Sequence, residues 1–140
     1  MPDSWDAFAK QALASAQAAA TSKATRQSSG DFIAELSEQL PELIGGSADL
    51  SGSNSTIWAA AAPVTGAGNG GNYIYYGVRE FAMTAIASGL ALHGGLIPFT
   101  GTFLMFMEYA RNAVRMSSLM GVGAIPVSYT HLTLPTILRV

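Results

Sequence analysis

The chain has 140 residues, of which 49% are hydrophobic and only 11% are charged, and its formal net charge is −2. This length suits one domain with a buried core, and the composition excludes an intrinsically disordered chain. The seven basic residues are scattered, so the positive patch that a nucleic acid or an anionic membrane surface requires is missing. The absence of cysteine excludes disulfides, thiolate zinc sites and thiol nucleophiles, and two histidines are too few for most metal centres.

An uncharged, largely apolar stretch, residues 81–107, exceeds the roughly 20 residues of a membrane span. A glycine pair and a proline interrupt it, and its residues change from helix-favouring to strand-favouring types. This pattern indicates a helix, a turn and a strand in a buried core. Asp3 and Asp6 stand where an export signal would carry positive charge, so we expect a cytoplasmic protein without a membrane span.

The N-terminal part of the chain is predicted to form two helices. Asp3 or Ser4 can cap a first, alanine-rich helix that reaches about residue 20. Thr25 can cap a second helix that ends at Leu40, before a proline. The first helix is expected to lie at the periphery.

The remainder of the chain alternates strands with helices. Strands are predicted at residues 43–44, 73–76, 96–100 and 124–129, and helices at residues 78–93 and 102–120. This alternation is typical of the α/β class, with a parallel sheet flanked by helices. The glycine-rich residues 45–49 are expected to form a polar loop at the carboxyl end of the first strand, where sites usually lie in such folds.

Glu80 is the only acidic residue between Asp49 and Glu108, and it lies in the first turn of the predicted helix at 78–93, among mostly apolar residues. The residues alone leave two interpretations open. Glu80 is either a first-turn glutamate that the helix dipole stabilises, or a partly buried carboxylate whose proton affinity is raised by its apolar surroundings.

Other candidate residues have simpler interpretations. Asp49 follows a glycine pair, which favours a turn residue that bonds its own backbone. Phe103, Phe106 and Tyr109 recur at i, i+3 and i+6 on the predicted last helix, which favours core packing over a pocket that stacks a planar ring.

Six short motifs follow one another along the chain: GGSADL at 45–50 with SN at 53–54, GNYI at 71–74, YGVREF at 76–81, LHGG at 92–95, TFLMF at 102–106 and EYARNAVRM at 108–116. Their order and spacing closely resemble the transketolase family, in its central pyrimidine-binding domain. The resemblance implies a thiamine diphosphate-binding fold that is incomplete here. Residues 1–23 would be an interdomain linker with a helix, and residues 24–126 the truncated pyrimidine-binding domain.

By this resemblance Glu80 matches the catalytic glutamate, which hydrogen-bonds N1′ of the thiamine diphosphate aminopyrimidine and promotes activation of the cofactor. Phe103, Phe106 and Tyr109 match the aromatic wall around the pyrimidine, which reverses the preference for plain core packing. Asp49 matches an acid close to the cofactor.

The resemblance also implies a substrate and a reaction. Arg26 and Ser53 match the pair that grips the phosphate of a sugar phosphate substrate. The reaction is the transfer of a two-carbon ketol unit from a ketose phosphate to an aldose phosphate. In the family, an N-terminal domain binds the diphosphate and its metal, Mg²⁺ or Ca²⁺, and the site forms between two subunits of a homodimer. Neither that domain nor the family's C-terminal domain is in this sequence, so we expect the chain alone to be inactive.

Residues 127–140 depart from the family, which continues into an acidic, glycine-containing substrate loop. Residues 127–132 are similar to a translated transposon end used in sequencing-library preparation, so we expect this tail not to be native. The match of His131 to the family's substrate-contacting histidine therefore carries little weight. Two rival hypotheses remain: a relative similar to dihydroxyacetone synthase, which transfers the same unit to formaldehyde, and a stand-alone interaction module without catalysis.

Overall fold

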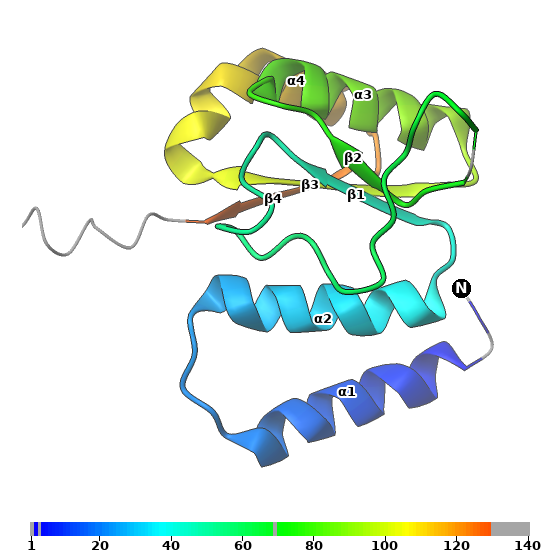
Figure 1. Cartoon of the computed structure of the whole chain (residues 1–140), viewed down its shortest axis with the longest axis vertical. Helices are drawn as coiled ribbons and strands as arrows, with labels where there is room; N and C mark the ends of the chain where they lie inside the picture. Colours follow the sequence, from blue (N-terminus) through cyan, green and yellow to red (C-terminus); the bar gives the residue numbers. More distant parts are fainter. Residues whose placement is uncertain (1, 3, 69, 130–140) are drawn as a thin grey trace, which may run out of the picture.

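The computed structural model describes residues 2, 4–68 and 70–129. Its elements are α1 (Trp5–Ala19), α2 (Thr25–Gln39), β1 (Leu43–Ser47), β2 (Tyr73–Tyr75), α3 (Glu80–His93), β3 (Ile97–Phe103), the short 3-10 helix η1 (Leu104–Phe106), α4 (Met107–Leu119) and β4 (Ile125–Tyr129) (Figure 1). The predicted order of helices and strands is confirmed.

The four strands form one parallel sheet in the order β2-β1-β3-β4, which confirms the predicted α/β class. Ser47, the last residue of β1, pairs with Tyr75 of β2 on one side and with Gly101 of β3 on the other. From β1 the chain moves outward to β2 and then crosses to the other side of β1 to form β3. The carboxyl ends of parallel strands meet at one edge, and such a reversal opens a crevice there.

Helices cover both faces of the sheet (Figure 1). On one face α3 and α4 pack against each other, and α3 also packs against β3. On the other face lies α2, with α1 outside it and with the long loop after β1 running between α2 and the sheet. No described residue of α1 is buried, which agrees with its predicted peripheral position.

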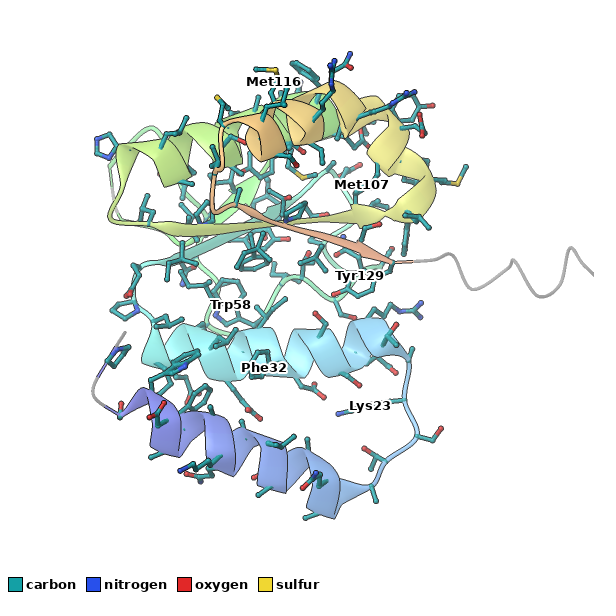
Figure 2. All side chains as sticks on the ribbon, turned by 180° about the vertical axis from the view of Figure 1, so that it is seen from behind. Lys23, Phe32, Trp58, Met107, Met116 and Tyr129 are labelled. Carbon is teal, nitrogen blue, oxygen red and sulfur yellow. The ribbon has the colours of Figure 1, made fainter. Side chains whose placement is uncertain are left out.

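Trp58, in the loop after β1, fills the space between the sheet and α2 (Figure 2). Its ring centroid lies 5.9 Å from that of Tyr73 and 6.1 Å from that of Phe99. The same buried cluster includes Ile33 of α2, Leu40 directly after that helix, and Leu43 of β1. Burial of these aromatic and aliphatic side chains supplies the main stabilisation of this face.

Two predicted boundaries are wrong, and strand pairing explains both. Gly45, Gly46 and Ser47 belong to β1 rather than to a loop, because all three pair with β2. Residues 102 and 103 belong to β3 rather than to a helix, because they pair with β4. The helix α4 begins only at Met107, after η1. Short apolar runs do not distinguish a buried strand from a helix, so tertiary pairing decides.

Within the part of the chain that the structure describes, no helix combines the length and the apolar character that crossing a membrane requires.

Candidate functional site

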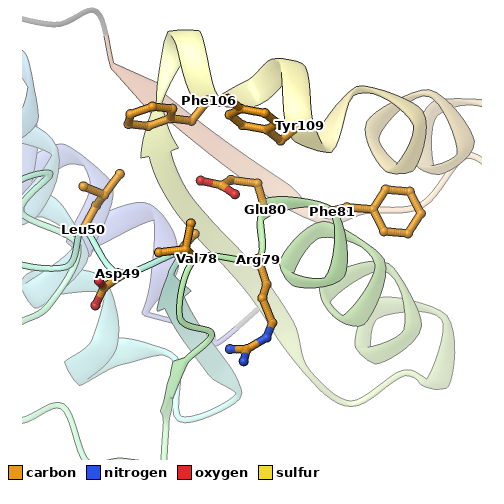
Figure 3. Close-up of a pocket in the computed structure, with 9 residues that line it drawn as sticks. Asp49, Leu50, Val78, Arg79, Glu80, Phe81, Phe106 and Tyr109 are labelled. Atoms are coloured by element: carbon orange, nitrogen blue, oxygen red, sulfur yellow. The ribbon is translucent and has the colours of Figure 1, made fainter.

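A pocket of about 560 Å³ opens at the carboxyl edge of the sheet (Figure 3). Three segments that are distant in sequence form it: the loop after β1, the turn from β2 into α3, and the segment of η1 and α4. Its lining consists of Ala48, Asp49, Leu50, Val78, Arg79, Glu80, Phe81, Phe106 and Tyr109. The sheet topology brings these segments together, because each follows the carboxyl end of a parallel strand.

Glu80 places a buried carboxylate in this pocket. It is the first residue of α3, and only 6% of its surface is exposed. The neighbouring Arg79 points away from it (Figure 3), and its Nη1 donates a 2.9 Å hydrogen bond to the carbonyl of Tyr76. Among the described residues Glu80 takes part in no ion pair. Glu80 thus lies at the positive end of the α3 dipole, as the first interpretation expects, and its side chain is also buried, as the second expects.

Asp49 lies in the same lining, on the loop that leaves β1. Its backbone is left-handed, with φ of 63°, which a non-glycine residue adopts at an energetic cost. The turn is closed by Ser47, whose Oγ accepts a 3.2 Å hydrogen bond from the backbone N–H of Leu50. Asp49 is thus a turn residue, as predicted, but a serine hydroxyl holds the turn.

Phe106 and Tyr109 form the aromatic side of the pocket. Their rings stack with centroids 6.4 Å apart and an interplanar angle of 23°. In Figure 3 both lie across the pocket from Leu50 and Asp49, with the Glu80 carboxylate between the two sides. Phe103 is buried at the end of β3 and does not belong to the pocket lining. Two of the three predicted aromatic residues therefore meet at the pocket.

The predicted phosphate-binding residues lie outside the lining. Arg26 is half-buried on α2, and Ser53 is exposed on the loop after β1. The helix α2 and the loop after β1 meet near these residues. Their closeness is evident at Gly30, where an added Cβ atom would lie 2.6 Å from the carbonyl oxygen of Ser55. Arg26 precedes Gly30 by one helical turn and so shares the face of α2 that meets the loop. His131 lies outside the described residues.

The sequence interpretation missed the apolar part of the lining, namely Leu50, Val78 and Phe81. Apolar side chains carry no chemical signature of their own. The one available signal was their position, since Leu50 directly follows Asp49, and Val78 and Phe81 flank Glu80 within three residues.

Comparison with known proteins shows close relatives. A family model described as "Transketolase, pyrimidine binding domain" matches residues 21–134. The chain is similar to Transketolase 1 of Vibrio cholerae, with 50% identity over 131 residues, which cover 94% of this chain and 20% of that protein. The chain thus spans about a fifth of the length of the curated relatives it matches.

Solved structures agree in fold. The transketolase from Leishmania mexicana superposes with a TM-score of 0.72 at 44% identity, over 74% of this chain and 16% of that one. A Pichia stipitis transketolase in complex with sedoheptulose 7-phosphate superposes with a TM-score of 0.74 at 34% identity, over 86% of this chain and 21% of that one.

Proposed function

Because this chain belongs to the transketolase family, as its pyrimidine-binding domain, we propose that it forms the aminopyrimidine half of a thiamine diphosphate site. The complete enzyme would transfer a two-carbon ketol unit from a ketose phosphate to an aldose phosphate. One observation carries this proposal: the buried carboxylate of Glu80 faces a pocket with a stacked pair of aromatic rings.

The residues present fit an aminopyrimidine. Such a ring is planar, has apolar faces and carries nitrogen atoms at its edge. Phe106 and Tyr109 offer flat surfaces for stacking, and Leu50 and Val78 add apolar walls that exclude water. Glu80 would hold a proton against the ring nitrogen N1′. When bound, thiamine diphosphate supplies the electron sink that allows a carbon–carbon bond beside a carbonyl group to break and form.

We further propose that Arg26 and Ser53 bind the substrate phosphate. A guanidinium group and a hydroxyl suit a phosphate well. The contact between α2 and the loop at Gly30 and Ser55 supports this proposal, because it brings the two elements that carry Arg26 and Ser53 together.

The divalent cation, Mg²⁺ or Ca²⁺, is proposed to be held by the diphosphate-binding domain of the complete enzyme. In residues 2, 4–68 and 70–129 no group of three or more histidine or acidic side chains is placed to hold a metal ion.

A homodimer is the proposed assembly, with the enzyme working in the cytoplasm. Large apolar side chains stand exposed around the pocket, with exposed fractions of 74% for Val78, 53% for Phe81 and 69% for Tyr109. Exposed apolar surface of this kind marks interaction sites. A second subunit that covered it would remove this surface from water and complete the pocket.

The test uses a chimeric enzyme in which residues 24–126 replace the matching segment of Vibrio cholerae Transketolase 1, with sedoheptulose 7-phosphate as donor. Glu80→Gln should reduce ketol transfer by about 100-fold or more, since proton-transfer groups contribute that much. Glu108→Gln is the matched control, because Glu108 is exposed on α4 and pairs with Arg111 at 3.8 Å. Near-normal transfer by Glu80→Gln, or an inactive chimera with Glu80 intact, would contradict the proposal.

A further inference from the structure

A buried polar cluster lies at the carboxyl end of β1, next to the pocket-lining residues 48–50. Ser47, Asn54 and Thr56 are each at most 2% exposed. The side-chain amide of Asn54 donates a 3.1 Å hydrogen bond to Ser47 Oγ, and Ser47 Oγ donates a 2.9 Å bond to the carbonyl of Gly101. Asn54 Oδ1 accepts bonds from Thr56, at 2.6 Å from Oγ1 and 3.2 Å from the backbone nitrogen.

This cluster demands an amide at position 54. Ser47 Oγ has given its only proton to Gly101, so it can only accept a bond from Asn54. Thr56 directs its backbone N–H and its hydroxyl to Asn54 Oδ1, and each group has a second partner, the Ser51 carbonyl at 3.1 Å and the Tyr73 hydroxyl at 3.0 Å. An amide side chain provides the donor and the acceptor together, whereas a carboxylate provides acceptors alone.

Two further hydrogen bonds of Ser47 and Asn54 close the loop around residues 48–50. Ser47 Oγ accepts from the N–H of Leu50, and the carbonyl of Leu50 accepts a 2.9 Å bond from the N–H of Asn54. Residues 48, 49 and 50 are all part of the pocket lining. Asp49 has a left-handed backbone, which persists only where surrounding contacts hold it.

The loop is also held from both sides. A Cβ atom on Gly101 would lie 2.3 Å from Thr56 Cγ2, and one on Gly30 would lie 2.6 Å from the carbonyl oxygen of Ser55. The loop therefore fits closely between β3 and α2. Because little free space surrounds it, the loop cannot rearrange without disturbing these neighbours when Asn54 is substituted.

We propose that Asn54 is a positioning residue for the cofactor pocket: through Ser47 it holds residues 48–50 in place, and so sets the affinity of the pocket for an aminopyrimidine. This inference rests on the proposed function. Asn54 touches neither cofactor nor substrate and acts through the loop.

The experiment uses the same chimeric enzyme. In Asn54→Ala we expect the dissociation constant of thiamine diphosphate, measured by titration calorimetry, to rise about tenfold, as the loss of a buried hydrogen-bonded group predicts. Hydrogen exchange of the peptide with residues 48–56 should accelerate by a similar factor. The kcat at saturating cofactor should stay within about twofold, because Glu80 remains in place.

Asn72→Ala is the matched control. Asn72 Oδ1 accepts a 2.8 Å bond from the N–H of Ala62 and holds a loop outside the pocket lining. Its loss should leave the dissociation constant unchanged. Ser47→Ala provides a second variant in case Asn54→Ala does not fold. It should weaken cofactor binding in the same way, and the double variant should bind no more weakly than either single variant.

An unchanged dissociation constant in Asn54→Ala, or in Ser47→Ala if the former is unfolded, would overturn the inference. An equal weakening in Asn72→Ala would overturn it too, because general destabilisation would then explain the effect. Cofactor binding and hydrogen exchange can both be measured without enzymatic turnover. A chimera that binds the cofactor but transfers no ketol unit would therefore refute the proposed function, whereas the dissociation constants of the variants would still test this inference.

Discussion

Gly101 of β3 lies directly against Thr56 of the loop after β1. A Cβ atom on Gly101 would come within 2.3 Å of Thr56 Cγ2 and within 2.9 Å of Asn54 Nδ2. Side chains of the loop that carries Asp49 thus pack directly on the backbone of a central strand, and the shape of one wall of the pocket depends on a glycine outside its lining.

Gly101→Ala should destabilise the chain by about 1–3 kcal/mol, because the added methyl group has no space beside Thr56. Urea unfolding followed by circular dichroism measures this change. Gly89→Ala is the control, since Gly89 lies within α3 with nothing within 4 Å of its Cβ position. This control should stabilise the chain by about 0.5–1 kcal/mol through helix propensity. Equal stability of the two variants would refute the packing argument.

Phe106→Ala should raise the dissociation constant of thiamine diphosphate in the chimeric enzyme about tenfold, because one of two stacking surfaces is lost. Titration calorimetry measures the constant. Phe32→Ala is the control: Phe32 lies on α2 (Figure 2), and its ring stacks on that of Phe8, with centroids 6.5 Å apart. If both variants bind the cofactor as tightly as the parent, Phe106 is not part of the binding surface.

Tyr76 should make the stability of the chain sensitive to alkaline pH. Burial raises the pKa of Tyr76 to about 12, with a further contribution from nearby Tyr73. Between pH 10 and 12 the unfolded chain releases this proton while the folded chain retains it. The contribution of Tyr76 to the free energy of unfolding is therefore fully present below pH 10 and is lost as the pH rises towards 12. At pH 11 the Tyr76 contribution to the loss is about 1.4 kcal/mol.

Tyr76→Phe should therefore lose less stability than the parent chain between pH 8 and pH 11. Urea unfolding at both values provides the comparison, and the values at pH 8 correct for the change in packing. Parallel losses in the two proteins would show that the Tyr76 hydroxyl does not couple folding to pH.

Several features of the fold followed from the sequence. The alternation of helices and strands predicted the α/β class, and the apolar helix after an isolated acid directed attention to Glu80. Such patterns can be recognised locally, because helical periodicity, glycine pairs and prolines act within a few residues. The motifs around Glu80 also predicted the family, which the comparisons confirm.

Other features were decided only by the tertiary structure. Strand pairing extended β1 to Ser47 and β3 to Phe103, and so removed Phe103 from the predicted helical row of aromatic residues. The parallel sheet brought Asp49, Glu80 and Phe106 to one edge, although they follow three different strands. Close approach of the loop after β1 explains Gly30, which faces the Ser55 carbonyl, and Gly101, which faces the side chains of Thr56 and Asn54. A network of hydrogen bonds explains Asn54. These contacts join residues distant in the chain, and no local pattern in the sequence encodes their proximity.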